Sequence, residues 1–320
     1  MHSHIFVGSF VNLIATFSAC QALSIGYVLD THDSTGDCKN VAQYQADFKL
    51  IERNIPKPTD GSQIIVRLSS SDKCKVFDIA IDALAASDIS DMRLWFDFQI
   101  PTIKGNDTLK GNGDFSKETL NSVLLGYIVD QVRNSIKFGQ ACDYLAGISL
   151  EHYGGLNAED IQAAMATVAI SRFISPSACS RVMSTFKTSA FAWLYEYRKL
   201  TGMGQIEFPF DIGVPIDDPD IHVITASLVN TVDDLVAAFP DVPVVVAGVS
   251  WASPWTSVRS ASSTDQQLYW QQFWCAKGDV ASANTIKAVF WDSAIDGANT
   301  NGLLDKDGNV KFRLENCKAM

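Results

Sequence analysis

The stretch "PVVVAGVSWASPW", which spans residues 243–255, has the pattern of a buried strand that ends in a cleft. Five of its first seven residues are apolar and three of those are consecutive valines, which is typical of a strand covered on both faces. Gly248 interrupts the apolar run, and two tryptophans follow among small polar residues. Strands of this kind in α/β proteins deliver a functional side chain at their carboxyl end. This one offers Ser250 but no Asp, Glu, His or Cys.

Short apolar runs alternate with helical patterns on both sides of this stretch. The predicted strands cover residues 24–30, 64–70, 92–100, 144–151, 205–211, 221–227, 242–248 and 285–292. Helices are predicted over residues 41–51, 117–138, 232–239 and 265–275, and from residue 157 onward. Eight such units without a linker or repeat predict one α/β domain over residues 23–320, closed as a (β/α)8 TIM barrel. A doubly wound open sheet is the alternative, but no GxGxxG motif follows a strand.

Residues 1–22 are predicted to be a secretory signal peptide. Residues 6–17 are mostly apolar, and Cys20 and Ala22 supply small residues before a cleavage point. A buried N-terminal strand or helix is the alternative. No other segment approaches the ~20 uninterrupted apolar residues of a membrane span. We therefore expect a secreted protein, extracellular or in the cell wall, with no membrane partner and a monomer as the default.

Charge and cysteine content narrow the classes of partner. The net charge of −11 argues against nucleic acid and fits a neutral or polyhydroxylated ligand. Without a CxxC motif, and with three histidines left after cleavage, no metal site and no cofactor are expected. Asn106 begins an N-x-T glycosylation sequon. An even number of cysteines in an exported chain favours disulfides, and six remain after cleavage: Cys38, Cys74, Cys142, Cys179, Cys275 and Cys317.

Acids and aromatic residues gather at the predicted strand ends, which suits sugar recognition. Carboxylates accept hydrogen bonds from hydroxyls, and flat rings stack on pyranose faces. The candidates for substrate contact, each of which could instead pack in the core, are Trp95, Asp97, Tyr153, Trp251, Trp255 and Trp291. Glycoside hydrolysis needs two carboxyl groups, and Glu151 at the end of the fourth strand is the first candidate, with Asp211 or Asp292 as its partner. The sequence argues against a serine hydrolase based on Ser250, because the fold with that motif needs a histidine after the serine in chain order, and no histidine follows His222.

Several segments resemble family-17 glycoside hydrolases, in particular the fungal cell-wall β-1,3-glucanases and glucanosyltransferases. They are "IGYVLDTHDSTGDCKN" from residue 25, "IIVRLSSSDKC" from 64, "LAGISLEHYGG" from 145, "VVVAGVSWAS" from 244 and "YWQQFWCAKG" from 269. The resemblance implies a barrel that acts on or binds β-1,3-glucan or a related polysaccharide. It also implies the pairs Cys38–Cys74 and Cys275–Cys317, which leave Cys142–Cys179, although six cysteines allow 15 arrangements.

The same resemblance implies that the catalytic positions are degenerate. The acid/base glutamate of the family falls on Tyr153, with Glu151 two residues earlier, about 6.6 Å along the strand. The nucleophile falls on Gly248, which carries no side chain. Three interpretations stay open: a catalytically impaired glucan-binding protein, an active hydrolase or transglycosylase that uses Glu151 with a relocated acid, and a non-catalytic structural or interaction protein.

Overall fold

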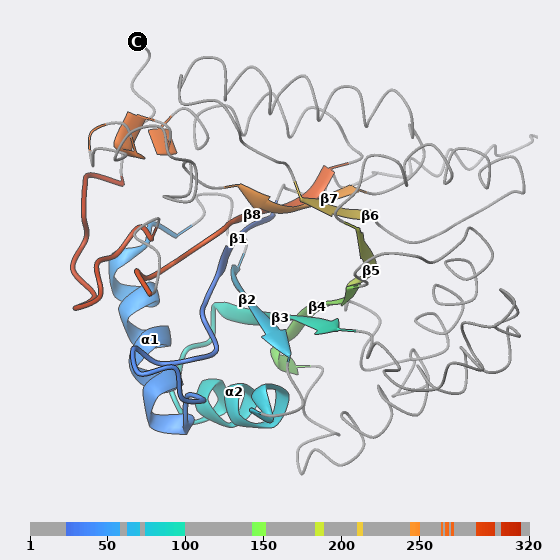
Figure 1. The fold of residues 1–320 in the computed structure, drawn as a ribbon, viewed down its shortest axis with the longest axis horizontal. Coiled ribbons are helices and arrows are strands. Elements are labelled where there is room, and N and C mark those ends of the chain that lie inside the picture. The colour runs from blue at the N-terminus through green and yellow to red at the C-terminus, as the bar shows by residue number, and fades with distance from the viewer. Residues whose placement is uncertain are drawn as a thin grey trace, which may run out of the picture.

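Eight parallel strands close into a barrel in the order of the sequence (Figure 1). The computed structural model describes residues 24–57, 63–70, 74–99, 143–151, 183–188, 210–213, 244–249, 264, 266–268, 270–271, 286–297 and 302–314. The strands are β1 Ser24–Val28, β2 Ile64–Ser70, β3 Met92–Gln99, β4 Leu145–Glu151, β5 Met183–Thr188, β6 Phe210–Gly213, β7 Val244–Val249 and β8 Ile286–Trp291. The closed sheet confirms the predicted barrel. The prediction of a helix after every strand, within one domain over residues 23–320, extends beyond the described residues.

The fifth and sixth strands differ from the prediction. Strand β5 was not predicted, because its sequence MSTFKT has only two apolar residues, Met183 and Phe186, and shows neither an apolar run nor strict alternation. The segment 205–211, predicted as the fifth strand, overlaps only the start of β6, Phe210–Gly213. The predicted strand 221–227 lies outside the described residues, and the barrel closes without it.

Two helices cover the outside of the barrel next to β1, β2 and β3 (Figure 1). Helix α1, Val41–Asn54, extends the predicted helix by one turn and begins with a capping box, in which Asn40 and Gln43 bind each other's backbone N–H. Its buried side chains are Tyr44, Phe48 and Ile51, as the apolar spacing predicts. Helix α2, Val76–Ala85, was not predicted and packs against α1, β2 and β3.

Large rings fill the barrel interior, and glycines make room for them. Trp95 of β3 and Phe290 of β8 meet edge to face with their centroids 5.2 Å apart. A Cβ atom at Gly147 would overlap the Trp95 ring, and one at Gly26 would overlap the Phe290 ring. The interior is therefore a close-packed core at this level rather than an open channel.

A second aromatic cluster lies outside the barrel and ties the C-terminal segment to it. The Trp270 ring contacts Tyr27 of β1 and Trp291 of β8, with centroids 6.2 and 5.0 Å away. Its indole N–H donates to the carbonyl of Leu314, at 3.2 Å. Within the described ranges, no helix combines the length and the apolar character that a membrane crossing requires.

Candidate functional site

Two of the three predicted catalytic positions, Glu151 and Asp292, lie where barrel strands end, whereas Asp211 lies within β6. Glu151 is the last residue of β4, Asp211 is the second residue of β6, and Asp292 directly follows β8. Because all eight strands are parallel, their carboxyl ends meet at one end of the barrel. Strand register also links two of these positions, since Glu151 pairs with Lys187 of β5, which in turn pairs with Asp211.

Gly248, the position of the expected nucleophile, is the next-to-last residue of β7. It pairs with Gly213 of β6, at a point where the register between the two strands shifts. Position 248 therefore lies near the carboxyl end of the seventh strand. The six residues of β7 include no carboxylate.

Asp292 lies across the barrel from Glu151. Strands β4 and β8 are four steps apart in a closed ring of eight, and so lie on opposite sides. A spacing of ~4.8 Å between strands and a tilt of ~36° give a barrel diameter of roughly 15 Å between Cα atoms. The Asp292 side chain is exposed. Backbone positions 151 and 292 therefore lie on opposite sides of the barrel mouth.

A buried polar network lies deeper in the barrel, between β2, β3 and β4. The guanidinium of Arg67 contacts both carboxylate oxygens of Asp97, with Nε 2.9 Å from each and Nη2 2.8 Å from Oδ1. The hydroxyl of Ser149 accepts hydrogen bonds from Arg67 Nη2 at 3.4 Å and from Trp95 Nε1 at 2.6 Å. Arg67 and Asp97 are 1% and 4% exposed, so solvent does not screen this ion pair.

This network changes the interpretation of two predicted sugar contacts. Trp95 is 1% exposed and packs on Phe290, while its N–H is taken up by Ser149. Asp97 is engaged by Arg67, whose guanidinium also lies 4.7 Å from the centroid of the Phe290 ring. As placed here, Trp95 and Asp97 therefore support the floor of the site and have no open surface for a ligand.

Trp291 occupies a position that does not fit the predicted sugar contact. Its ring has no exposed surface and stands at 87° to the Trp270 ring, in the layer outside the barrel. Successive side chains of a strand point to opposite faces, and its neighbour Phe290 belongs to the interior core. The tryptophan therefore faces away from the barrel mouth.

The remaining predicted site residues and the predicted signal peptide lie outside the described residues. These are residues 1–22, Asn106, Cys142, Tyr153, Cys179, Trp251, Trp255, Cys275 and Cys317. Their predicted roles stay predictions.

One predicted disulfide is present. Cys38, in the loop after β1, is bonded to Cys74, just before α2, and their Cα atoms are 5.2 Å apart. The bond ties two loops together at the carboxyl ends of β1 and β2, the same end of the barrel as Glu151 and Asp292. This confirms the Cys38–Cys74 pair.

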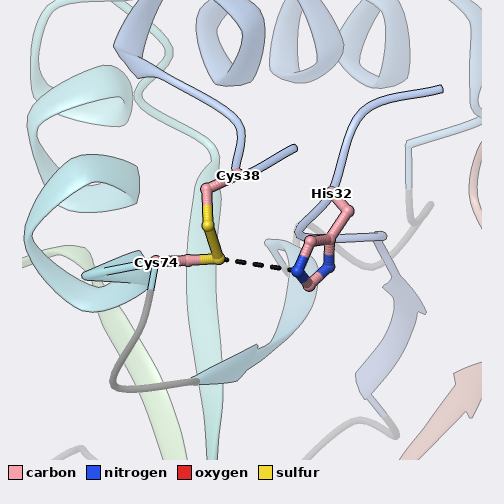
Figure 2. A group of neighbouring side chains, drawn as sticks. All are labelled: His32, Cys38 and Cys74. Carbon is pink, nitrogen blue, oxygen red and sulfur yellow. Dashed lines mark hydrogen bonds between the residues drawn. A yellow bond between two sulfur atoms is a disulfide. The ribbon is translucent and has the colours of Figure 1, made fainter. Parts of the chain in front are cut away.

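A histidine lies against this disulfide (Figure 2). His32 Nε2 is 3.5 Å from Cys74 Sγ, and the ring is exposed. Within the described residues, His32, Cys38 and Cys74 place three metal-ligating atoms within 4.8 Å of one another. While the two sulfurs are bonded to each other, no thiolate is available and the group is not a metal site.

The loop that carries His32 is held by an aspartate turn. Asp33 Oδ1 accepts hydrogen bonds from the backbone N–H of Thr35 and of Asp37, at 2.9 and 3.1 Å, and from the Thr35 hydroxyl at 2.6 Å. These bonds, led by the Thr35 hydroxyl, favour the charged carboxylate and lower the pKa of Asp33 to about 2. These hydrogen bonds therefore hold the loop in a defined conformation independently of the disulfide.

Sequence reasoning missed Arg67, Ser149 and His32. A signal for Arg67 was present, because an arginine inside the apolar strand IIVRLSS must find a buried acid. Its partner Asp97 can be identified only when β2 and β3 are paired in register. Arg67 then lies beside Trp95, and Asp97 lies two residues further along β3, beside Ser69. Nothing in the local sequence pointed to His32 as a neighbour of Cys74.

Solved structures of several glycoside hydrolases have a similar fold. The sequence matches no protein-family model and no curated protein. The structure of a glycoside hydrolase family 17 β-1,3-glucanosyltransferase from Rhizomucor miehei is similar, with a TM-score of 0.61 and 14% identity over 90% of this chain and 97% of that one. An active-site mutant of Rhizomucor miehei β-1,3-glucanosyltransferase in complex with laminaritriose has the same TM-score and coverage at 15% identity.

A more distant likeness points to the same architecture. The GH53 catalytic domain of Ignisphaera aggregans has a TM-score of 0.55 and 11% identity over 96% of this chain and 99% of that one. Identities this low establish a shared fold and leave the activity of this chain to its own residues. The predicted resemblance is confirmed at this level: the chain shares the barrel fold of glycoside hydrolases, a family-17 glucanosyltransferase among them.

Proposed function

We propose that this protein is an exported β-1,3-glucan-binding barrel, related to family-17 glycoside hydrolases, whose retaining catalysis is impaired. The observation that carries the proposal is Gly248, which stands at the carboxyl end of β7 where the family resemblance expects the nucleophile. A retaining enzyme needs a nucleophilic carboxylate about 5 Å from its acid/base partner. Glu151 ends β4 as one carboxylate, and β7 supplies no second one.

The support for a glucan ligand comes from the fold and from the residue types near the barrel mouth. A solved structure with this fold is a β-1,3-glucanosyltransferase in complex with laminaritriose. The buried network of Arg67, Asp97 and Ser149 forms a rigid floor below the end of β4, so a preorganised groove is compatible with the loss of one carboxylate. Tyr153, Trp251 and Trp255 are the aromatic candidates for stacking on the sugar rings.

The test combines turnover with binding. The purified protein is incubated with laminari-oligosaccharides, and we expect neither shortened nor elongated products. Calorimetric titration with the same oligosaccharides should show saturable binding. Trp251→Ala should weaken this binding, while the control variant Trp291→Phe, which keeps an aromatic ring in the buried cluster, should leave the affinity unchanged, because Trp291 packs against Trp270 outside the barrel. A titration that shows no binding would contradict the proposal and favour the third interpretation, a structural or interaction protein without a glucan ligand.

A second candidate function is an active hydrolase or transglycosylase, and the position of Asp292 favours it. This side chain is exposed and follows β8, opposite the strand that ends in Glu151. Asp211 is the other candidate partner, separated from Glu151 by Lys187 in the register of β4, β5 and β6. Turnover that Glu151→Gln abolishes would rule out the impaired enzyme, and Asp292→Asn against Asp211→Asn would then identify the second acid.

Export is part of the proposal and has its own test. We expect the protein to accumulate in the medium or the cell wall of an expressing cell, with its N-terminus cut after Ala22. N-terminal sequencing of the extracellular protein checks this. Retention in the cell with Met1 intact would contradict it.

A further inference from the structure

We propose that His32, Cys38 and Cys74 form a redox-gated metal site, which binds one Zn²⁺ through one imidazole nitrogen and two thiolates when the disulfide is reduced. His32 and Cys38 lie in the loop after β1, and Cys74 lies two residues before α2 begins. The three side chains point toward one another (Figure 2). Two cysteines, one histidine and an open fourth position make up a known ligand set for zinc.

The distances fit tetrahedral coordination. With Zn–N near 2.0–2.1 Å and Zn–S near 2.3 Å, a tetrahedral ion separates its N and S ligands by about 3.6 Å and two S ligands by about 3.8 Å. His32 Nε2 already lies 3.5 Å from Cys74 Sγ. Only the two sulfurs have to move apart, which follows from breaking the bond between them, while the Cα atoms can stay near their separation of 5.2 Å.

A second layer of contacts orients the imidazole. His32 Nδ1 lies 3.3 Å from the hydroxyl of Thr31 and 3.8 Å from Asp30 Oδ1. The backbone N–H of His32 donates to the same Asp30 oxygen at 3.0 Å. Metal-binding histidines in proteins commonly hold their second nitrogen in this way, which directs the first one at the ion. Nε2 is the nitrogen that faces the sulfurs.

The loop would keep His32 and Cys38 together after reduction. These two residues form an antiparallel bridge, and the N–H of Lys39 donates to the carbonyl of Thr31 at 3.1 Å. The hydrogen bonds from the backbone N–H groups of Thr35 and Asp37 to Asp33 hold the residues between His32 and Cys38 in a turn. His32 and Cys38 are exposed, which gives an ion and a water molecule access, whereas Cys74 is 4% exposed and anchors the site.

The redox step balances with a dithiol as the reductant. The dithiol supplies two electrons and two protons, the S–S bond breaks to give two thiols, and the dithiol becomes a disulfide. Zn²⁺ then binds the two sulfurs as thiolates and releases the two protons. The metal and the disulfide exclude each other, so only the reduced protein would bind the ion.

The test uses Co²⁺ as a spectroscopic probe for Zn²⁺ on the full chain. The protein is reduced with a phosphine, which does not compete for the metal as a thiol would. We expect one equivalent of Co²⁺ to give a thiolate-to-metal absorption band and tetrahedral d–d bands, both lost when Zn²⁺ is added. The oxidised protein should give neither band.

His32→Ala is the decisive variant, because it retains every cysteine and the disulfide. We expect its affinity for Co²⁺ in the reduced state to fall at least about tenfold, since even outer contacts to a metal ligand change affinity by this much. Cys74→Ser should abolish the thiolate band. Equal binding by His32→Ala, equal binding by the oxidised protein, or no thiolate band in the reduced protein would each overturn the proposal. A reduced chain that unfolds and stays unfolded with Co²⁺ also overturns it, whereas one that refolds with Co²⁺ supports it.

Discussion

The buried ion pair between Arg67 and Asp97 predicts a large loss of stability for Asp97→Asn. The substitution keeps the shape of the side chain and removes the negative charge that Asp97 places beside the buried Arg67 guanidinium. Three N–O contacts of 2.8 to 2.9 Å put the two charge centres about 4 Å apart, which corresponds to about 4 kcal/mol at an effective dielectric constant of ~20. Breaking one side of a buried pair in other proteins costs about 3–5 kcal/mol.

The expected loss of unfolding free energy lies near the lower end of this range, because Arg67 keeps other contacts. Its guanidinium stays near the Phe290 ring, and its Nη2 still donates to Ser149. We therefore expect Asp97→Asn to lower the free energy of unfolding by about 3 kcal/mol in urea denaturation. Asp91→Asn is the matched control, since it makes the same change in the partly exposed pair with Lys57 and should cost about 0–1 kcal/mol.

A double variant separates lost pairing from lost packing. Arg67→Met with Asp97→Leu removes both charges and should recover most of the stability, because apolar residues of similar volume often replace a buried pair without loss. If Asp97→Asn costs no more than Asp91→Asn, the pair is not buried as described. If the double variant is as unstable as Asp97→Asn, packing rather than the lost charge sets the cost.

Three further predictions concern the core, the loop after β1 and the disulfide. Gly147→Ala should lower the free energy of unfolding by about 1–3 kcal/mol, because its Cβ meets the Trp95 ring; a neutral result in urea would contradict the close packing. The pKa of Asp33 is lowered, so its stabilisation is complete above its ordinary pKa of 3.8 and is lost as the pH falls through about 2. The difference in unfolding free energy between the wild type and Asp33→Asn should therefore shrink over that range, and a constant difference would refute it. Replacing both Cys38 and Cys74 by serine should cost about 4 kcal/mol, from the loop entropy of a 36-residue separation, measured by denaturation of the oxidised proteins.

Local patterns in the sequence predicted much of the architecture. Apolar runs at β1, β2, β3, β4, β7 and β8 and the capped helix α1 follow from short-range hydrophobic periodicity. Strand β5 was not predicted because its sequence MSTFKT contains too few apolar residues to give a strand signal. The family resemblance supplied the Cys38–Cys74 pair, which local pattern alone leaves among many arrangements.

The sequence by itself determined which residue types are available at the strand ends, including the glycine at position 248 of β7. Tertiary structure decided which of them meet: Trp95 faces inward and Trp291 outward, Arg67 reaches Asp97, and His32 lies on Cys74. The physical reason is that side-chain facing alternates with every residue, so a small shift in register reverses it. Register is set by pairing with neighbouring strands and by closure of the barrel, which connect residues far apart in the chain.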